Sequence, residues 1–137
     1  MKKKETAMDK KELGKKGENS AASFLCGKGF TIVGRNVRCG HLETDIIAKN
    51  ERNIVFAEVK TRREYPKSHS PFGRPSSAVD GRKRKNLIAA AEAFLRENRE
   101  KVHGLIPRID VIEVYISPNT EDYKVLKILH MENAVGK

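Results

Sequence analysis

The chain has 137 residues, of which 38% are hydrophobic and 34% are charged; this length suits one compact domain and is too short for two. Its 28 Lys and Arg residues outnumber 18 Asp and Glu residues, giving a net charge of +10. Such a surplus favours nucleic acid as partner over an anionic membrane or a merely solubilising surface. No run approaches the roughly 20 apolar residues of a transmembrane helix, and the start lacks the apolar stretch of a signal peptide, so we expect a cytoplasmic protein.

Residues 1–10 are mostly charged and carry no apolar periodicity, so we interpret them as a flexible basic N-terminal arm. A single domain then covers residues 11–137. Its first predicted element is a helix over residues 11–28, which stops at Gly29. Small and apolar residues recur at four-residue spacing along one face of this helix: Leu13, Gly17, Ala21 and Leu25.

Glu18 lies beside this face of the first helix, and its neighbours at helical spacing include Ala22 and Leu25. Its carboxylate is therefore predicted to turn toward the core rather than toward solvent. Two interpretations stay open, namely a salt bridge at the edge of the helix and a carboxylate that supports a functional site.

Three strands are predicted next, over residues 30–33, 44–48 and 54–60. The polar residues 49–53 separate the second strand from the third and are typical of a hairpin loop. These two strands should therefore pair, because positions at similar distances from a short loop face each other across it.

Asp45, Glu58 and Lys60 place charges inside these apolar strands. Strand alternation puts Glu58 and Lys60 on one face, and the hairpin brings Asp45 near Glu58. A structural ion pair with Lys60 alone is the simpler interpretation, but one lysine cannot neutralise two converging carboxylates. The pattern predicts that Asp45 and Glu58 bind Mg²⁺ or Mn²⁺, and that Lys60 orients the attacking water.

Residues 61–77 contain three prolines and several basic residues, which is typical of a loop. Because this loop follows the strand that carries the acids, its cations are candidates for phosphate contacts. Tyr65 and Phe72 are candidates for stacking on exposed bases. The basic candidates are Arg62, Arg63, Lys67 and Arg74.

A second helix is predicted over residues 80–100, and four basic residues, at positions 82–85, crowd its first turns. Positive charge there opposes the helix dipole, so we expect an external anion to compensate it. Lys83 and Lys85 are the candidates of this cluster for binding nucleic acid.

Two further strands are predicted over residues 109–116 and 124–130. Asp110 is expected to be structural and to pair with Arg108 or Arg38 near the sheet edge. The histidines lack the spacing of a zinc site and are interpreted as surface or packing residues: His41, His69, His103 and His130. The order of elements predicts an α/β domain with a mixed central sheet flanked by helices.

The arrangement of Asp45 and Glu58-Val59-Lys60 resembles the PD-(D/E)XK nuclease superfamily, with Asp45 as the lone acid and the second segment as the (D/E)XK element. Further motifs follow in order from about Gly14 to about Val114 and make the chain similar to the bacterial YraN family, also designated UPF0102. These motifs are Gly14-Lys-Lys-Gly17-Glu18, Arg35-Asn36, Arg38, Phe56-Ala-Glu-Val-Lys-Thr-Arg62, Ala78-Val79, Lys83 and Arg108-Ile-Asp110-Val. The family is described as endonuclease-like and is distantly similar to archaeal Holliday junction resolvases.

The resemblance implies a restriction-endonuclease-like core and metal-dependent hydrolysis of phosphodiester bonds, on branched or single-stranded DNA by analogy. It implies four catalytic residues, Glu18, Asp45, Glu58 and Lys60. Where the family usually reads Gly-Glu-Ile-Asp, this chain has Leu at position 42 and Thr at position 44, which keeps the acids and alters the turn. Junction resolvases act as dimers, so a homodimer stays open.

Two other functions stay open beside the nuclease. The main alternative is a non-catalytic nucleic-acid-binding protein on the same fold, because a scaffold can keep its binding surface after losing activity. A weaker alternative is a small RNA- or ribosome-associated protein that binds through its positive charge.

Overall fold

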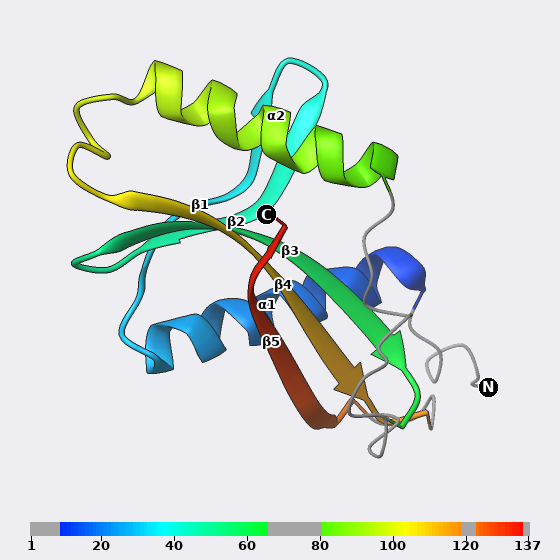
Figure 1. Ribbon diagram of the computed structural model, residues 1–137. Helices are drawn as coiled ribbons and strands as arrows, with labels where there is room; N and C mark the ends of the chain where they lie inside the picture. The colour runs from blue at the N-terminus through cyan, green and yellow to red at the C-terminus, as the bar shows by residue number, and fades with distance from the viewer. Residues whose placement is uncertain (1–8, 66–80, 119–122, 136–137) are drawn as a thin grey trace.

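The computed structural model describes residues 9–65, 81–118 and 123–135. They form a helix, three strands, a second helix and two strands, in the predicted order (Figure 1). The elements are α1 (Lys10–Gly27), β1 (Thr31–Cys39), β2 (Leu42–Lys49), β3 (Asn53–Arg63), α2 (Gly81–Glu97), β4 (Ile106–Ile116) and β5 (Val125–Val135).

The strands form one mixed sheet in the order β1-β2-β3-β4-β5. β3 and β4 run parallel and are joined by the segment that contains α2, whereas the other neighbours are antiparallel. The two helices cover opposite faces of the sheet, and both begin on the side where the arrows of β3 and β4 end (Figure 1). The topology confirms the predicted α/β fold with a mixed central sheet flanked by helices.

Each helix buries one apolar face against the sheet, so the core has two parts. The part between α1 and the sheet consists of residues of α1, of Phe30 and of strands β2, β3 and β4: Ala21, Ala22, Leu25, Phe30, Ile46, Ala48, Val55, Ala57, Ile112, Val114 and Ile116. Under α2 lie Ile47, Ile54, Phe56, Leu87, Ala91, Phe94, Ile109 and Val135. Strand alternation therefore assigns the residues of β2, β3 and β4 to one helix or the other.

Gly17 lets α1 approach the sheet closely. A Cβ atom at this position would overlap the side chain of Thr61 in β3. Asp9 caps the start of the helix by accepting a hydrogen bond of 2.9 Å from the backbone N–H of Glu12. The close approach at Gly17 also sets the distance of its neighbour Glu18 from the sheet.

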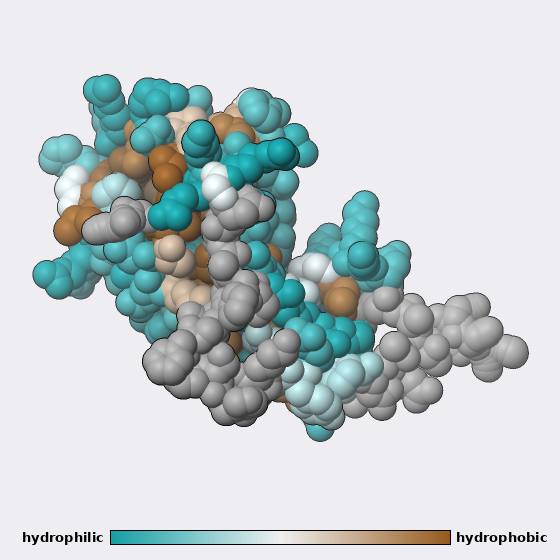
Figure 2. All heavy atoms as spheres, turned by 45° about the vertical axis from the view of Figure 1, so that its right-hand side comes forward, coloured by the Kyte–Doolittle hydropathy of each residue, from teal (hydrophilic) through white to brown (hydrophobic). Residues whose placement is uncertain are grey.

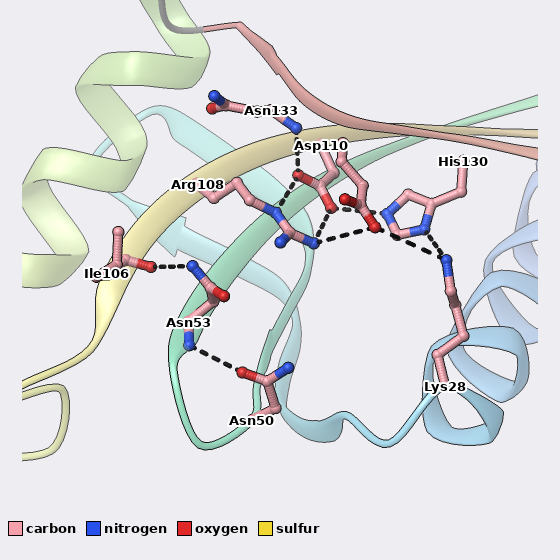
Figure 3. Close-up of polar contacts among 9 residues, drawn as sticks. Lys28, Asn50, Asn53, Ile106, Arg108, Asp110, His130 and Asn133 are labelled. Carbon is pink, nitrogen blue, oxygen red and sulfur yellow. Dashed lines mark hydrogen bonds and ion pairs between the residues drawn. The ribbon is translucent and has the colours of Figure 1, made fainter.

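The predicted hairpin between β2 and β3 is confirmed. The side-chain oxygen of Asn50 accepts hydrogen bonds of 3.0 and 2.8 Å from the backbone N–H groups of Arg52 and Asn53. The side chain of Asn53 in turn donates to the carbonyl of Ile106 at 3.1 Å, which ties the turn to the start of β4 (Figure 3). This turn sets the register that brings the two acidic positions together.

β1 is longer than predicted, because it continues beyond residue 33 to Cys39. Gly34 and Asn36, whose φ is +50°, disfavour a strand by local preference. Pairing with β2 nevertheless extends to the end of the strand, with a register shift between Ile32 and Gly34. Tertiary pairing here outweighs the local preference.

Two other predicted segments lie partly outside the described residues. The arm over residues 1–10 falls outside them except for its last two positions, which cap and begin α1. The predicted loop over residues 61–77 begins too early, because residues 61–63 continue β3. Residues 66–80, which include Lys67, Arg74 and Phe72, are not described. No helix in the described part of the chain is long and apolar enough to cross a membrane.

Candidate active site

Asp45, Glu58 and Lys60 lie on one face of the sheet, the face that α2 covers. The register pairs Ile47 with Phe56, and both side chains pack under α2. Counting by twos along each strand places the three charged residues on the same face. The ladder between β2 and β3 stops just before Asp45 and Glu58 would pair, so both acids stand where the two strands part.

Asp45 is held by the backbone of β3. Its Oδ2 atom accepts a hydrogen bond of 2.8 Å from the N–H of Val59. Burial raises the pKa of the Asp45 carboxyl to about 7; the Val59 hydrogen bond and Lys83 lower it, whereas the carboxylates of Glu58 and Glu18 raise it further. The Asp45 carboxyl is thus poorly solvated and lies close enough to two other carboxylates for their charges to act on it.

Glu58 is paired with Lys83 from the first turns of α2, at a distance of 3.0 Å between Oε2 and Nζ. The Glu58 side chain is 12% exposed and that of Lys83 is 46% exposed. The partner that sequence reasoning considered for Glu58 was Lys60, which forms no ion pair within the described residues. The cation that meets Glu58 therefore comes from a distant helix rather than from the same strand.

Glu18 reaches the same region from α1. Its Oε1 atom accepts from Asn36 at 3.2 Å and lies 3.4 Å from the guanidinium of Arg35. The side chain is 17% exposed, which agrees with the predicted inward orientation. Both open interpretations keep support, because the salt bridge at the helix edge is present and the charge of Glu18 also acts on Asp45.

The candidates for binding nucleic acid are distributed over both faces. Arg62 shares the face of Glu58 and Lys60, whereas Arg63 belongs to the opposite alternation and donates to the carbonyl of Ser117. Lys85 is exposed on α2, two residues beyond the lysine that pairs with Glu58. Arg74 lies outside the described residues. Hydrophilic side chains surround smaller hydrophobic patches on the side of the molecule that Figure 2 brings forward.

Asp110 lies at the centre of a separate polar cluster (Figure 3). Its two oxygens accept from the guanidinium of Arg108 at 3.0 Å each, and Oδ2 lies 2.7 Å from Nε2 of His130. The backbone N–H of Asn133 adds a bond of 2.9 Å. Burial raises the pKa of Asp110, but these hydrogen bonds outweigh it and leave the pKa below its ordinary value.

The structural role predicted for Asp110 agrees with these contacts, and its partner is Arg108, one of the two predicted candidates. The predicted place near the sheet edge was wrong, because β4 lies between β3 and β5. His130 is 4% exposed and packs edge-on against Phe24, at 5.8 Å between ring centroids. This cluster lies under α1, on the face opposite the three candidate residues.

Glu113 is the buried acid that sequence reasoning did not single out. It has no exposed surface and accepts a hydrogen bond of 2.7 Å from the hydroxyl of Tyr115. The signal was a charged residue within the apolar run of β4, the same signal that drew attention to Asp45 and Glu58. Lys83 was singled out, but its contact with Glu58 could not be inferred because 25 residues separate them along the chain.

The donor set at Asp45 and Glu58 fits Mg²⁺ or Mn²⁺. These ions bind through one or two carboxylates and keep several waters. The described residues include no group of three or more His, Cys, Asp or Glu side chains that could hold a metal. Burial is the largest cause of the raised pKa of Asp45, so this carboxyl lies in a poorly solvated position, where a bound cation would stabilise its ionised form.

Comparison with known proteins gives a family and its members. The model of the uncharacterised protein family UPF0102 matches residues 17–114. A UPF0102 protein of Caldicellulosiruptor saccharolyticus is 43% identical over 127 residues, which are 93% of this chain and 99% of that protein. A UPF0102 protein of Caldanaerobacter subterraneus subsp. tengcongensis is 38% identical over 127 residues, covering 93% and 97%.

Among solved structures, Pyrococcus furiosus SfsA in complex with Ca²⁺ aligns over 94% of this chain, with a TM-score of 0.38 and 16% identity. The chain spans 66% of that protein, just under two thirds of its length.

Proposed function

This chain belongs to the uncharacterised protein family UPF0102, and we propose that it is a nuclease that hydrolyses phosphodiester bonds in DNA with Mg²⁺ or Mn²⁺. The observation that carries the proposal is the meeting of Asp45, Glu58 and Lys60 on one face where β2 and β3 part. Two acids that bind a cation, beside a lysine that faces the phosphoryl group, are the parts that metal-assisted hydrolysis requires.

Each residue has a separate task in this proposal. Asp45 and Glu58 would hold the cation, which supplies positive charge beside the phosphoryl group when bound. Lys60 orients the attacking water and donates a hydrogen bond to a phosphoryl oxygen as negative charge develops there. Glu18 adds negative charge to the region and so favours cation binding.

Binding of the polyanion rests on the basic surface of the protein. The net charge is +10, and α2 begins with basic residues and no acidic residue in its first turn. In this proposal, Lys83 beside Glu58 and Lys85, exposed on the same helix, contact backbone phosphates of the substrate. Such contacts release counterions, so binding should weaken steeply with salt.

One observation favours the non-catalytic alternative. Lys83 already neutralises Glu58, and the raised pKa of Asp45 lets that group stay protonated near neutrality. The site therefore approaches neutrality without a metal, as a purely structural cluster would. Under this alternative the protein binds nucleic acid through its basic surface, and its acids only maintain the fold.

Cleavage of labelled single-stranded, duplex, flap and four-way-junction DNA, with Mn²⁺ or with EDTA, decides between the two functions. We expect cutting with Mn²⁺ that disappears in a Glu58→Ala, Lys60→Ala variant and persists in a Glu97→Ala, Lys101→Ala variant. The second variant removes the same two charges from exposed positions, one at the last residue of α2 and one four residues beyond it. Intact DNA in every reaction, together with salt-sensitive binding, would establish the non-catalytic alternative for these substrates.

A further inference from the structure

Glu113 is a carboxylate with no exposed surface in the middle of β4, flanked along the chain by two fully buried residues, Ile112 and Val114. Removing an ionised carboxylate from water costs free energy, and an apolar residue of similar size at such a position is often neutral or stabilising. A sequence that keeps the acid here departs from the rule for a core strand. Departures of this kind are expected where a residue serves function.

Both oxygens of this carboxylate are held. The hydroxyl of Tyr115 donates to Oε1 at 2.7 Å, and Nε of Arg62 lies 3.4 Å from Oε2. Tyr115 is 4% exposed, so its hydroxyl is fixed by the core. The Glu113 carboxylate is therefore a rigid acceptor. Of its two partners named here, Arg62 is the one that reaches solvent, because its side chain is 27% exposed.

Arg62 continues the row of candidate active-site residues along β3. Glu58, Lys60 and Arg62 alternate on one face, with successive members about 7 Å apart along the strand. The parallel register sets Lys60 beside Glu113 and Arg62 beside Tyr115. The row therefore leads from Glu58, which would hold the metal ion, through Lys60 to the guanidinium of Arg62, which Glu113 orients.

We propose that Glu113 is a positioning residue that holds Arg62 as a contact for a backbone phosphate of a nucleic-acid strand running along β3 beyond Lys60. The inference rests on the proposed function for the identity of the substrate. Guanidinium groups bind phosphate through a planar fork, and their orientation decides whether the fork meets the phosphate oxygens. Glu113 fixes that orientation from the neighbouring strand β4.

The competing explanation is structural, in which the pair only joins β3 to β4. The two explanations differ in the electrolyte dependence of DNA binding. Fluorescence anisotropy can measure the binding of a labelled single-stranded oligonucleotide in EDTA at several salt concentrations. Each phosphate contact adds to the slope of log K, the logarithm of the binding constant, against the logarithm of the salt concentration. A structural pair affects unfolding and leaves this slope unchanged.

The variants form a double-mutant cycle of Glu113→Gln, Arg62→Gln and their combination, with Arg99→Gln as the control that removes an exposed arginine beyond the end of α2. We expect each single variant to reduce the slope by about 1 and the combination to reduce it no further. We expect the control to leave it unchanged. A slope that Glu113→Gln does not alter, or reductions that add in the combination, would overturn the inference.

Thermal unfolding of each variant confirms that binding is measured on folded protein, and Glu113→Met, an apolar side chain of similar length, replaces Glu113→Gln if the latter does not fold. Binding in EDTA is independent of cleavage. A wild type that binds DNA and never cuts it contradicts the proposed nuclease alone, whereas an unchanged slope in the Glu113 variant contradicts the positioning role alone.

Discussion

The Oδ2 atom of Asp45 accepts a hydrogen bond of 2.8 Å from the backbone N–H of Val59, at the point where the ladder between β2 and β3 ends. A side-chain carboxylate here takes the place of a backbone acceptor, so the two strands separate without leaving the Val59 N–H unpaired. The same bond fixes Asp45 beside the strand that carries Glu58 and Lys60. Local architecture and the candidate site therefore depend on one contact.

Replacing Asp45 with Asn should stabilise the protein at alkaline pH. The folded-state pKa of Asp45 is raised from 3.8 to about 7, so the native state binds a proton more tightly than the unfolded chain. Stability then falls as pH rises from about 4 to about 7 and stays low above that range. Asn is isosteric, carries no charge and can accept the same hydrogen bond. At pH 8 the variant should be more stable by at most about 4 kcal/mol.

Urea unfolding at pH 4 and pH 8 measures this difference. The gain should be present at pH 8 and should shrink to a small fraction of that value at pH 4, where the native carboxyl is protonated and the unfolded one, with a pKa of 3.8, is only about half ionised. Glu43→Gln, which replaces an exposed acid on the same strand, is the matched control and should show no comparable gain. Equal stability of wild type and the Asp45 variant at both pH values would contradict the burial assigned to this carboxyl.

Lys83 and a divalent cation should compete for Glu58. The ion pair between Lys83 and Glu58, 3.0 Å long, leaves the lysine side chain about half exposed. It should therefore contribute only about 0–1 kcal/mol to stability. Lys83→Met should therefore tighten Mn²⁺ binding by up to about 5-fold, as measured by isothermal titration calorimetry. Lys85→Met removes the same charge from an exposed position on the same helix and should change the affinity little at physiological salt. Equal affinities in the two variants would show that Lys83 does not oppose the cation.

Much of the fold followed from local patterns. Apolar spacing predicted both helices, alternation predicted the strands, and the polar turn around Asn50 predicted the hairpin that brings Asp45 to Glu58. Each of these signals lies within a short window of sequence. β1 was predicted too short because its second half contains Gly34 and Asn36 and depends on pairing with β2.

The contacts that complete the site were not predictable in this way. Glu58 lies in β3, whereas its partner Lys83 lies in α2, the next element along the chain. The contact of Arg62 with Glu113 depends on the parallel register of β3 and β4, which no hairpin fixes. Neither the angle of a crossover helix nor a parallel register is specified by nearby residues, so both pairs required the structure.

Asp110→Asn should destabilise the protein by up to about 3–5 kcal/mol at neutral pH, because it removes a fully buried carboxylate that pairs with Arg108 and leaves Arg108 only its longer ion pair of 3.8 Å with Glu132. The lowered pKa of Asp110 gives a pH dependence opposite to that of Asp45. Its contribution is present above the unfolded-state pKa and is lost as pH falls through the folded-state pKa, so the difference from wild type should shrink in acid. Urea unfolding along a pH series tests this, and a difference that grows in acid would contradict the paired, ionised state.

Gly17→Ala and Gly14→Ala should have opposite effects although both lie in α1. A Cβ atom at position 17 would overlap the side chain of Thr61, and overpacking of this kind costs about 1–3 kcal/mol. A Cβ atom at position 14 meets no atom within 4 Å, so alanine should stabilise the helix there by about 0.5–1 kcal/mol. Because α1 must move away from β3 to accommodate the methyl group added at position 17, Glu18 moves with it, and Mn²⁺ affinity should fall only in that variant. Chemical denaturation and Mn²⁺ titration of both variants check the pair of expectations, and a stable Gly17→Ala variant with unchanged Mn²⁺ affinity would show that the close approach of α1 does not support the site.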